Sequence, residues 1–587
     1  MDRNNLIGFT LIAVLLFVYF TFFAPKPELP VQSQNTSEVV ADDQVKPGAN
    51  DSTQLPAADT LALSIDTITL ENKELKLQFS SLGGKIIYAE LKKYIKYGGE
   101  PLVLINGKSS DFKLQIPMDN QMLDLNQLAY SFVHDSLNST LVFTRAEGNH
   151  SITQTWSLPN SGYVVDYKLQ IDGAVLKNEN LQLEWINRMP LVEKDIADSR
   201  TKTAINYHTL TEEQDGLSES SVDPESMTIP EGTDWVGMKQ KFFLSAILNK
   251  KGFASGEIKT SVDPKDSSTV KTGTAQLKIS AAQLTSAEGL NFQFYLGPND
   301  YKTLDAIANG FSANVYLGWP PVKWVNQYFI VPVFQFLTGL TSNYGLIIII
   351  LVLIIRLVLL PLSYKSYLGM AKMRLLKPEL DELKIKYQDD QMKFSQEQMK
   401  LFSEVGASPF AGCIPLLLQM PILFAMFYLF PSSIEFRQQT LPFADDISTY
   451  DSVLSFSFAL PLIGSHISIY TLLMTLSTLA ITWQNNQIST VDGPMKSLSY
   501  IMPLVFFFVL NSFPASLSFY YLVGNIASFG QQLLIKRFVD EDKIKSVMEE
   551  HRKKITASGS GNKSAFMSRL SDALKASEEA RKKNKRS

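Results

Sequence analysis

The sequence has little of the chemistry on which most active sites depend. Cysteine occurs once, at Cys413, so no disulfide can form within the chain. The five histidines are scattered singly, which does not favour a metal site. The segment GSGNKS near Gly559 lacks the Gly-Lys pair of a phosphate-binding loop and follows no predicted strand. We therefore expect no metal, no cofactor and no enzymatic activity.

Carboxylates are absent from every long apolar run of the chain, yet one run contains an arginine. This run, GLIIIILVLIIRLVLLPL from Gly345 to Leu362, is long enough to cross a bilayer as a helix and includes Arg356. A charge there costs about 3 kcal/mol on insertion scales. Arg356 must therefore be solvated by water, polar side chains or lipid phosphate, or pair with a carboxylate of a visiting molecule. Alternatively, it snorkels towards Lys365, about 13 Å further along the helix.

Six apolar runs predict six membrane-spanning helices. The first follows MDRNN and ends at Ala24-Pro25 without a small-residue cleavage site, so we interpret residues 1–24 as a retained anchor rather than a cleaved signal peptide. The arginine run is the second and opens a membrane core at 341–535. The remaining spans are predicted at Ile414–Phe430, Ile467–Trp483, Leu498–Phe513 and Ser516–Ile535.

Basic residues are distributed unevenly along the chain. Residues 363–412 hold eight Lys and Arg, whereas 431–466 holds Arg437 alone. The tail at 536–587 has 15 Lys and Arg against 8 Asp and Glu. The positive-inside rule then places both termini in the cytoplasm and residues 25–344 outside it. The basic tail indicates an anionic partner, either lipid headgroups or nucleic acid, or else a solvated, disordered segment.

The outer region divides into three parts. Residues 25–60 are rich in Pro, Asp, Ser and Gln and are predicted to be a disordered linker. Alternating stretches such as LALSIDTITL and YVVDYKLQI predict many short strands, hence a large β-sandwich domain over 61–317.

Residues 318–340 predict an amphipathic helix lying on the outer leaflet, rather than a seventh span. In this interpretation Trp324, Val325, Tyr328 and Phe329 form its apolar face. Its polar residues are Lys323, Asn326 and Gln327.

Between the second and third spans, residues 363–411 predict an antiparallel helical hairpin in the cytoplasm. Apolar residues recur at intervals of three and four, and Gly406 and Pro409 provide a helix stop. The repeating positions are Met370, Met373, Leu376, Leu380, Leu383 and Tyr387 in the first helix and Phe394, Met399, Phe402 and Val405 in the second. The hairpin is either a spacer or a docking surface whose exposed methionines adapt to varied clients.

Two later spans carry polar stripes. They comprise Thr471, Thr475, Thr478, Thr482 and Asn485 in one span and Ser518, Tyr521, Asn525, Ser528 and Gln532 in the other. Such stripes often join helices through hydrogen bonds. Together with Arg356 they also suggest a hydrated groove open to the cytoplasm. The predicted groove residues are Arg356, Gln419, Met420, Thr475, Thr482, Ser518, Tyr521, Asn525 and Ser528.

Long blocks of this sequence resemble the YidC/Oxa-type membrane protein insertases. The core blocks are NYGLIIIILVLIIRLVLLPLSYKSYLGMAKMRLLKPEL, GCIPLLLQMPILFAMFYLF and FPASLSFYYLVGNIASFGQQLLIKR. Upstream, TDWVGMKQKFFLSAIL and FYLGPND resemble the periplasmic domain of the Gram-negative form. The family's arginine matches Arg356, its glutamine matches Gln419, and its aromatic pair matches Tyr520 and Tyr521. A polar residue found in some relatives one turn before the arginine is Val352 here.

The resemblance implies an insertase of the bacterial inner membrane with six spans, a periplasmic β-supersandwich and a cytoplasmic hairpin. It further implies nascent membrane proteins as clients, with the Sec translocon and the ribosome as partners beside the bilayer, and no role for DNA. The sandwich resembles sugar-epimerising domains without being expected to act as an enzyme. The alternative function is a secondary transporter or channel. Such proteins usually carry intramembrane carboxylates and internal repeats, and the sequence shows neither.

Overall fold

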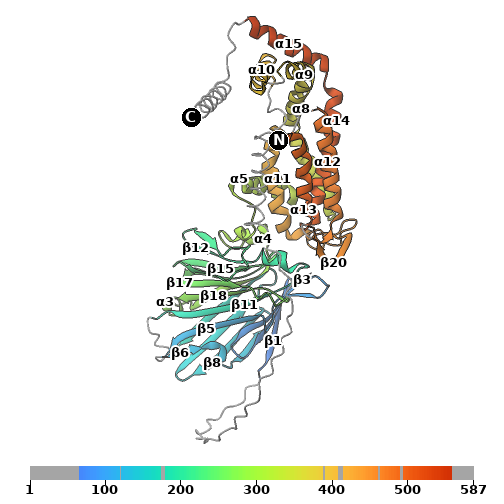
Figure 1. Cartoon of the computed structure of the whole chain (residues 1–587). Coiled ribbons are helices and arrows are strands. Elements are labelled where there is room, and N and C mark those ends of the chain that lie inside the picture. Colours follow the sequence, from blue (N-terminus) through green and yellow to red (C-terminus); the bar gives the residue numbers. More distant parts are fainter. Residues whose placement is uncertain are drawn as a thin grey trace, which may run out of the picture. The chain divides into compact units, whose positions relative to one another are not determined.

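The computed structural model describes residues 65–557 except 119–120, 174–178, 388–389, 408–413, 461–462 and 489–493. The predicted anchor at 1–24, the linker at 25–60 and the tail beyond 557 lie outside the described residues. Strands dominate the first half of the described chain and helices the second half (Figure 1).

The strands of the first half form three antiparallel sheets. In sheet order, the nine-stranded sheet contains β13 (Gln214–Gly216), β12 (Ala204–Thr209), β15 (Thr233–Lys239), β16 (Phe243–Phe253), β19 (Leu290–Pro298), β10 (Val164–Asp172), β9 (His150–Ser157), β8 (Thr140–Glu147) and β7 (Ser131–Asp135). The six-stranded sheet contains β14 (Glu225–Ile229), β17 (Ser255–Ser261), β18 (Thr269–Ile279), β11 (Leu181–Pro190), β5 (Ser110–Met118) and β6 (Gln121–Asp124). The four-stranded sheet contains β1 (Thr67–Glu71), β2 (Leu75–Ser80), β3 (Lys85–Ile95) and β4 (Pro101–Ile105).

Aromatic side chains join the three sheets into one core. Phe294 of the nine-stranded sheet lies 6.3 Å from Trp185 of the six-stranded sheet, measured between ring centroids. Trp156 on β9 lies 5.2 Å from Phe79 on β2. The period-two alternation produces this core, because β11 buries Leu183, Trp185 and alternate neighbours while the residues between them stay at least partly exposed.

The run TDWVGMKQKFFLSAIL departs from this alternation. Most residues of β15 and β16 are buried, on both faces of the sheet. The second face is covered by the segment after β19, where the Trp235 indole donates to the carbonyl of Asn309 at 3.1 Å. Short helices in this half are η1 (Leu125–Gln127), α2 (Ile196–Arg200), α3 (Ala281–Leu284), α4 (Tyr301–Asp305) and η2 (Phe311–Asn314).

The predicted amphipathic helix is present, but one residue of its predicted polar face is buried. It comprises α5 (Pro320–Val325), the π-helical turn η3 (Asn326–Ile330) and α6 (Val331–Thr338). Asn326, predicted to be on the polar face, is fully buried and donates to the carbonyls of Leu317 and Ala425 at 2.9 and 3.0 Å. Trp324 and Tyr328, predicted to share the apolar face, are 59% and 72% exposed. Asn326 therefore does not lie on an exposed polar face as predicted, because a buried polar side chain is tolerated once it is hydrogen-bonded. The exposure of Trp324 and Tyr328 does not contradict the predicted apolar face, which was expected to meet the outer leaflet.

The arginine run does not form one continuous helix. It divides at Leu359 into α7 (Tyr344–Val358) and α8 (Leu360–Leu375), which are bent by 61°. Pro361 lies in the first turn of α8, where its missing N–H and its ring disfavour a continuous helix. Taken alone, no described helix has both the length and the hydropathy of a membrane span, whereas α7 and α8 have them as a bent pair.

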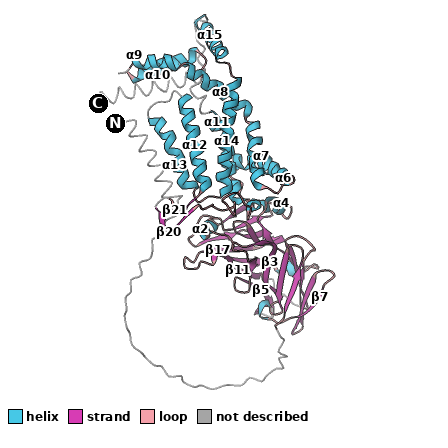
Figure 2. Ribbon diagram, turned by 90° about the vertical axis from the view of Figure 1, so that its right-hand side faces the viewer, coloured by secondary structure: helices cyan, strands magenta, loops and turns pink. Residues whose placement is uncertain are grey.

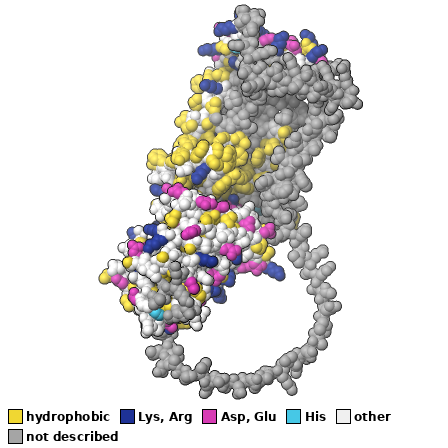
Figure 3. Space-filling model, turned by 90° about the vertical axis from the view of Figure 1, so that its left-hand side faces the viewer, with side chains coloured by type: hydrophobic (Ala, Val, Ile, Leu, Met, Phe, Trp, Pro, Cys, Tyr) yellow, Lys and Arg dark blue, Asp and Glu magenta, His cyan; other side chains and the backbone are white. Residues whose placement is uncertain are grey.

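Further helices follow, and contacts join α14 to both α7 and α12, which run alongside it in Figure 2. Their bounds are α11 (Ile414–Ser432), η4 (Ile434–Phe436), α12 (Ile469–Ile488), α13 (Pro494–Leu510) and α14 (Ala515–Phe538). A short hairpin of β20 (Leu454–Leu460) and β21 (Gly464–Ile467) precedes α12. Exposed apolar side chains cover much of the helical part, whereas charged ones are spread over the strands (Figure 3).

The cytoplasmic hairpin of the prediction corresponds to α9 (Lys377–Lys386) and α10 (Gln391–Glu404), which pack together and follow α8 after a break at Leu376. Gly406, with a φ of +61°, ends α10 as predicted. The methionines predicted to be exposed, Met370, Met373 and Met399, are half-buried.

The tail is ordered at its start, contrary to the disordered alternative. Helix α15 (Glu541–Ala557) packs Ile544 and Met548 against Leu380 and Phe402 of the hairpin. The basic charge of the tail does not by itself indicate this helix, whose apolar residues face the hairpin.

Candidate functional site

Arg356 lies in the last turn of α7, three residues before the break at Leu359. Its guanidinium turns towards the neighbouring helices. Nη1 donates to Oε1 of Gln419 on α11 at 3.4 Å, and Nη2 donates to the carbonyl of Gly524 on α14 at 3.1 Å. The side chain is half-buried. Snorkelling is therefore not what the structure shows, since both contacts draw the guanidinium between helices.

Both acceptors of Arg356 are neutral. Among the described residues no carboxylate forms an ion pair with it, in agreement with the absence of Asp and Glu from the apolar runs. Hydrogen bonds to neutral acceptors solvate a guanidinium but leave its charge uncompensated. The site therefore keeps a positive charge able to attract an anionic or polar group.

A small cavity of about 20 Å³ lies beside the guanidinium. Its walls include Arg356, Gln419, Tyr521 and Asn525 of the predicted groove. A cavity of this size holds about one water molecule. In this conformation the site is thus much smaller than a groove that could hold a peptide, and the predicted hydrated groove open to the cytoplasm stays a prediction.

The other predicted groove residues lie outside the cavity. Ser518 is fully buried and its hydroxyl lies 2.9 Å from that of Thr471 on α12. Thr475 and Ser528 donate to carbonyls of their own helices, those of Thr471 and Gly524. Met420 and Thr482 are half-buried on α11 and α12 and do not line the cavity.

The polar stripes join α12 and α14. The Asn525 amide donates to the hydroxyls of Ser477 and Thr478 at 2.9 and 2.8 Å, and Gln532 donates to Asn485 at 3.4 Å. These contacts correspond to the interhelical alternative considered for the stripes. Asn525 belongs to both arrangements, since it also lines the cavity.

The structure adds Gly524 and Tyr520 to the site. The Gly524 carbonyl accepts from Arg356 and also from Ser528, at 3.1 and 2.7 Å. Tyr520 is buried and lines the cavity next to Tyr521, whose hydroxyl donates to the carbonyl of Leu423 at 3.1 Å. A backbone acceptor leaves no signal in the sequence except that Gly524 lies within the polar stripe of its helix.

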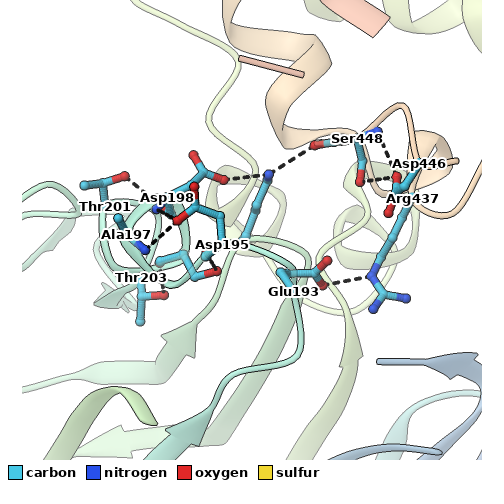
Figure 4. Close-up of polar contacts among 11 residues, drawn as sticks. Glu193, Asp195, Ala197, Asp198, Thr201, Thr203, Arg437, Asp446 and Ser448 are labelled. Atoms are coloured by element: carbon cyan, nitrogen blue, oxygen red, sulfur yellow. Dashed lines mark hydrogen bonds and ion pairs between the residues drawn. The ribbon is translucent and has the colours of Figure 1, made fainter. Parts of the chain in front are cut away.

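A second charged cluster joins the strands to the loop after α11 (Figure 4). The Lys241 ammonium lies 2.7 Å from Asp198 and donates to the carbonyl of Ser448 at 3.2 Å. The Arg437 guanidinium lies 2.8 Å from Glu193. Lys241 and Arg437 are almost fully buried. The Arg437–Glu193 pair is shielded from solvent, whereas the Asp198 side chain is 34% exposed.

The charges of this cluster shift one another's pKa values. Burial alone disfavours ionisation, but Lys241 lowers the pKa of Asp198 overall, and Asp198 in turn raises the pKa of Lys241. Burial raises the pKa of Glu193, with Arg437 opposing the shift. Close by, burial and the Asp300 carboxylate raise the pKa of Glu435 to about 7.

Comparison with known proteins finds two matching families and several relatives similar over nearly the whole chain. The 60Kd inner membrane protein family matches residues 336–543, and the YidC periplasmic domain matches residues 67–331. The membrane protein insertase YidC of Amoebophilus asiaticus is 40% identical, with 98% of this chain and 99% of that protein aligned. The corresponding protein of Cytophaga hutchinsonii is also 40% identical, over 99% of this chain and 98% of its own length.

Among solved structures, a crystal structure of an active YidC insertase with its first transmembrane domain resolved covers 89% of this chain and 98% of its own. The sequence identity is 16% and the TM-score 0.32. The two relatives carry the assignment, because each is 40% identical to this chain over nearly its whole length, the strand-rich half and the helical half included. The chain belongs to the YidC family of membrane protein insertases.

Proposed function

We propose that this membrane protein insertase receives the translocated segment of a nascent protein at the polar site around Arg356. The observation that carries the proposal is the uncompensated guanidinium, held by the Gln419 side chain and the Gly524 carbonyl. An acidic or polar segment gains electrostatic attraction there that lipid cannot offer. The cavity of about 20 Å³ has no room for a peptide as it stands. The helices that carry the predicted groove residues therefore move apart as the client enters.

The energy for insertion comes from the client. Its apolar helix partitions into lipid after the polar segment has crossed, and apolar burial contributes about 25 cal/mol per Å². No nucleotide is needed for this step. The protein shortens the apolar path of the polar segment and carries out no chemical transformation.

In the proposed membrane arrangement the protein crosses the bacterial inner membrane six times. Both termini and the hairpin of α9 and α10 are cytoplasmic, and residues 25–344 are periplasmic. Exposed apolar side chains on the helices support lipid contact, among them Leu353 and Leu357 on α7 and Ile526 on α14, all more than half exposed. The eight basic residues at 363–412 support the cytoplasmic side of the hairpin.

The proposed partners are the nascent chain, the Sec translocon and the ribosome. The hairpin of α9 and α10 and the basic tail would face the ribosome, whose RNA is anionic. The tail retains a net charge of +7 over 536–587, from 15 Lys and Arg minus 8 Asp and Glu. Such an attraction weakens as the salt concentration rises.

The test is insertion into proteoliposomes of a single-span client with an acidic translocated tail, scored by protease protection. We expect Arg356→Ala to reduce the protected fraction by about threefold to tenfold, equivalent to about 0.7–1.4 kcal/mol, and Arg356→Lys to retain most of it. Lys365→Ala is the matched control, since it removes an exposed positive charge nine residues along the chain.

A client whose acidic residues are replaced by serine distinguishes loss of electrostatic attraction to Arg356 from misfolding of the site. If attraction to Arg356 drives insertion, Arg356→Ala affects this neutral client far less than the acidic one. Equal loss for both clients would indicate misfolding of the site, and equal protection for all variants would remove Arg356 from the mechanism.

A further inference from the structure

The hairpin of β20 and β21 exposes apolar side chains at its surface. Val453, Leu454 and Phe458 are 50%, 54% and 61% exposed. The strands pair at Leu454 with Ile467 and at Leu460 with Gly464. The register shifts between these pairs, so that Phe458 lies in an irregular stretch of β20. Such a concentration of exposed apolar groups on a short hairpin calls for a covering surface.

The base of this hairpin is buried and fixed to the end of a helix. Asp451 accepts hydrogen bonds from the Ser468 hydroxyl and the Ile469 N–H, both at 2.6 Å, at the start of α12. Asp451 and Ser468 are 3% and 0% exposed. The hairpin therefore cannot swing freely away from α12.

A second attachment comes from the end of α13. The Asn511 amide donates to the carbonyls of Ile463 and His466 at 2.9 and 2.7 Å, and its oxygen accepts from the Ser468 N–H at 3.0 Å. Figure 2 shows the hairpin beside the ends of α12 and α13. The exposed apolar side chains are thus held at the level where two helices of the core end.

The distance from these helix ends is short. Leu454 follows Asp451 by three residues, which span at most about 11 Å of extended chain. The headgroup region on each side of a bilayer is about 5–8 Å thick. The interface is therefore within reach of Leu454 if the helices cross the membrane.

The chemistry of the segment suits lipid better than a protein partner. Residues 452–491 contain no Lys, Arg, Asp or Glu, so the hairpin can enter the headgroup region without removing a charge from water. The strands of the sandwich, by contrast, expose many charged side chains (Figure 3).

We infer that the β20–β21 hairpin is a membrane anchor that inserts Leu454 and Phe458 into the outer-leaflet interface beside α12 and α13. This inference rests on the membrane arrangement proposed above for those helices. It adds a lipid contact on the periplasmic side that is separate from the site around Arg356.

The test is site-directed spin labelling of the full chain in nanodiscs, with Cys413→Ser removing the native thiol. Labels at Phe458→Cys and Val453→Cys report the hairpin, and Ser457→Cys is the neighbour control. Leu472→Cys, 42% exposed on α12, is the lipid reference, and Leu137→Cys, 95% exposed in the turn after β7, is the water reference. The measured quantity is the ratio of collisions with oxygen to collisions with a water-soluble nickel complex.

We expect the ratio at 458 to exceed that at 137 severalfold and to approach that at 472, with 457 lower than 458. A ratio at 458 and 453 equal to that at 137 would overturn the inference while leaving the membrane arrangement intact. Dipolar broadening between labels at 458 would also overturn it, because it would show that a second copy covers the hairpin. A water-like ratio at 472 would overturn both the arrangement and the anchor.

Discussion

Two arginines of this protein are buried in different ways, and the difference separates a structural contact from a candidate receiving site. Arg437 lies 2.8 Å from the Glu193 carboxylate, so its charge is compensated inside the protein. Arg356 bonds to a side-chain amide oxygen and a backbone carbonyl, which leave its charge available. Both residues are arginines, and the charge of the acceptor determines which of them can still attract a client segment.

At the same scale, Glu435 predicts a pH-dependent stability. Its pKa is raised to about 7 by burial and by Asp300, so the folded protein holds the proton more tightly than the unfolded chain. The stabilisation is fully present below about pH 4.5 and is lost as the pH rises through about 7. We expect the free energy of unfolding of Glu435→Gln to match that of the wild type at pH 5 and to exceed it at pH 8 by about 1–3 kcal/mol. The expected difference is limited to this range because the half-buried carboxylate is partly screened by solvent.

The measurement is the thermal unfolding midpoint in nanodiscs, followed by tryptophan fluorescence at both pH values. Glu288→Gln is the control, since this side chain is 75% exposed. An equal effect of Glu435→Gln at pH 5 and pH 8 would contradict the prediction.

Among the elements, α15 has a structural role that the sequence patterns did not predict. Arg374 on α8 pairs with Glu541, and Arg552 lies 2.7 Å from Glu379 on α9. Together with Ile544 and Met548 these pairs hold α15 against the hairpin. The start of the basic tail therefore fixes the orientation of the hairpin of α9 and α10.

Gly406 provides a test of this packing. A Cβ added there would lie 3.1 Å from the His551 ring of α15, and the φ of +61° is unfavourable for alanine. We expect Gly406→Ala to cost about 1–2 kcal/mol and to speed hydrogen exchange in α15 by about fivefold to thirtyfold.

Gly530→Ala is the matched control on α14. A Cβ there meets nothing within 4 Å, so the substitution should leave exchange in α15 unchanged and stabilise its own helix by up to about 1 kcal/mol. Unchanged exchange in Gly406→Ala would show that α15 does not depend on the contact with His551.

For the whole molecule, charged contacts join the strand-rich half to the loop after α11. Arg437 pairs with Glu193, Lys241 donates to the Ser448 carbonyl at 3.2 Å, and Lys194 donates to the Tyr450 carbonyl at 3.3 Å. The partners lie more than two hundred residues apart in sequence. These contacts hold the loop that leads to β20 and α12 against the strands.

Removing one partner of the Arg437–Glu193 pair should be costly. We expect Arg437→Ala to lower the free energy of unfolding by about 3–5 kcal/mol, because Glu193 would remain buried without a counter-charge. The double variant Arg437→Met, Glu193→Met should recover most of this loss. Both are measured by the unfolding midpoint and by limited proteolysis of residues 431–451.

The exposed pair of Lys96 and Glu100 is the control, and Lys96→Ala should cost less than about 1 kcal/mol. If the double variant is as unstable as Arg437→Ala, the loss comes from packing rather than from an unpaired charge.

Much of the fold was accessible from residue patterns. Period-two alternation predicted the strands, because each strand such as β11 buries one face. The hairpin of α9 and α10 followed from apolar spacing and Gly406. The break at Leu359 was not predicted, because hydropathy does not reflect the effect of Pro361 on helix continuity. The burial of Asn326 was not predicted either, because its hydrogen bonds come from tertiary packing.

The candidate site divides in the same way. Sequence patterns singled out Arg356, Gln419, Tyr521 and Asn525, which the structure brings around one cavity. The same patterns also grouped Ser518 and Thr475 with these residues. Both are buried, and their hydroxyls form hydrogen bonds within and between α12 and α14. Helical periodicity gives the face of a residue on its own helix but not the partner that this face meets.

By itself, the sequence determined that an arginine lies in an apolar run and that this run has no carboxylate, because composition and order alone decide both facts. It likewise determined the alternation that makes strands. Only the tertiary structure decided that Gly524 offers its carbonyl to Arg356, that Lys241 meets Asp198, and that β20 remains uncovered. The two contacts join residues distant in the chain, and β20 is uncovered because no described segment packs on its exposed side chains. Packing depends on shape and hydrogen-bond geometry that no local pattern encodes.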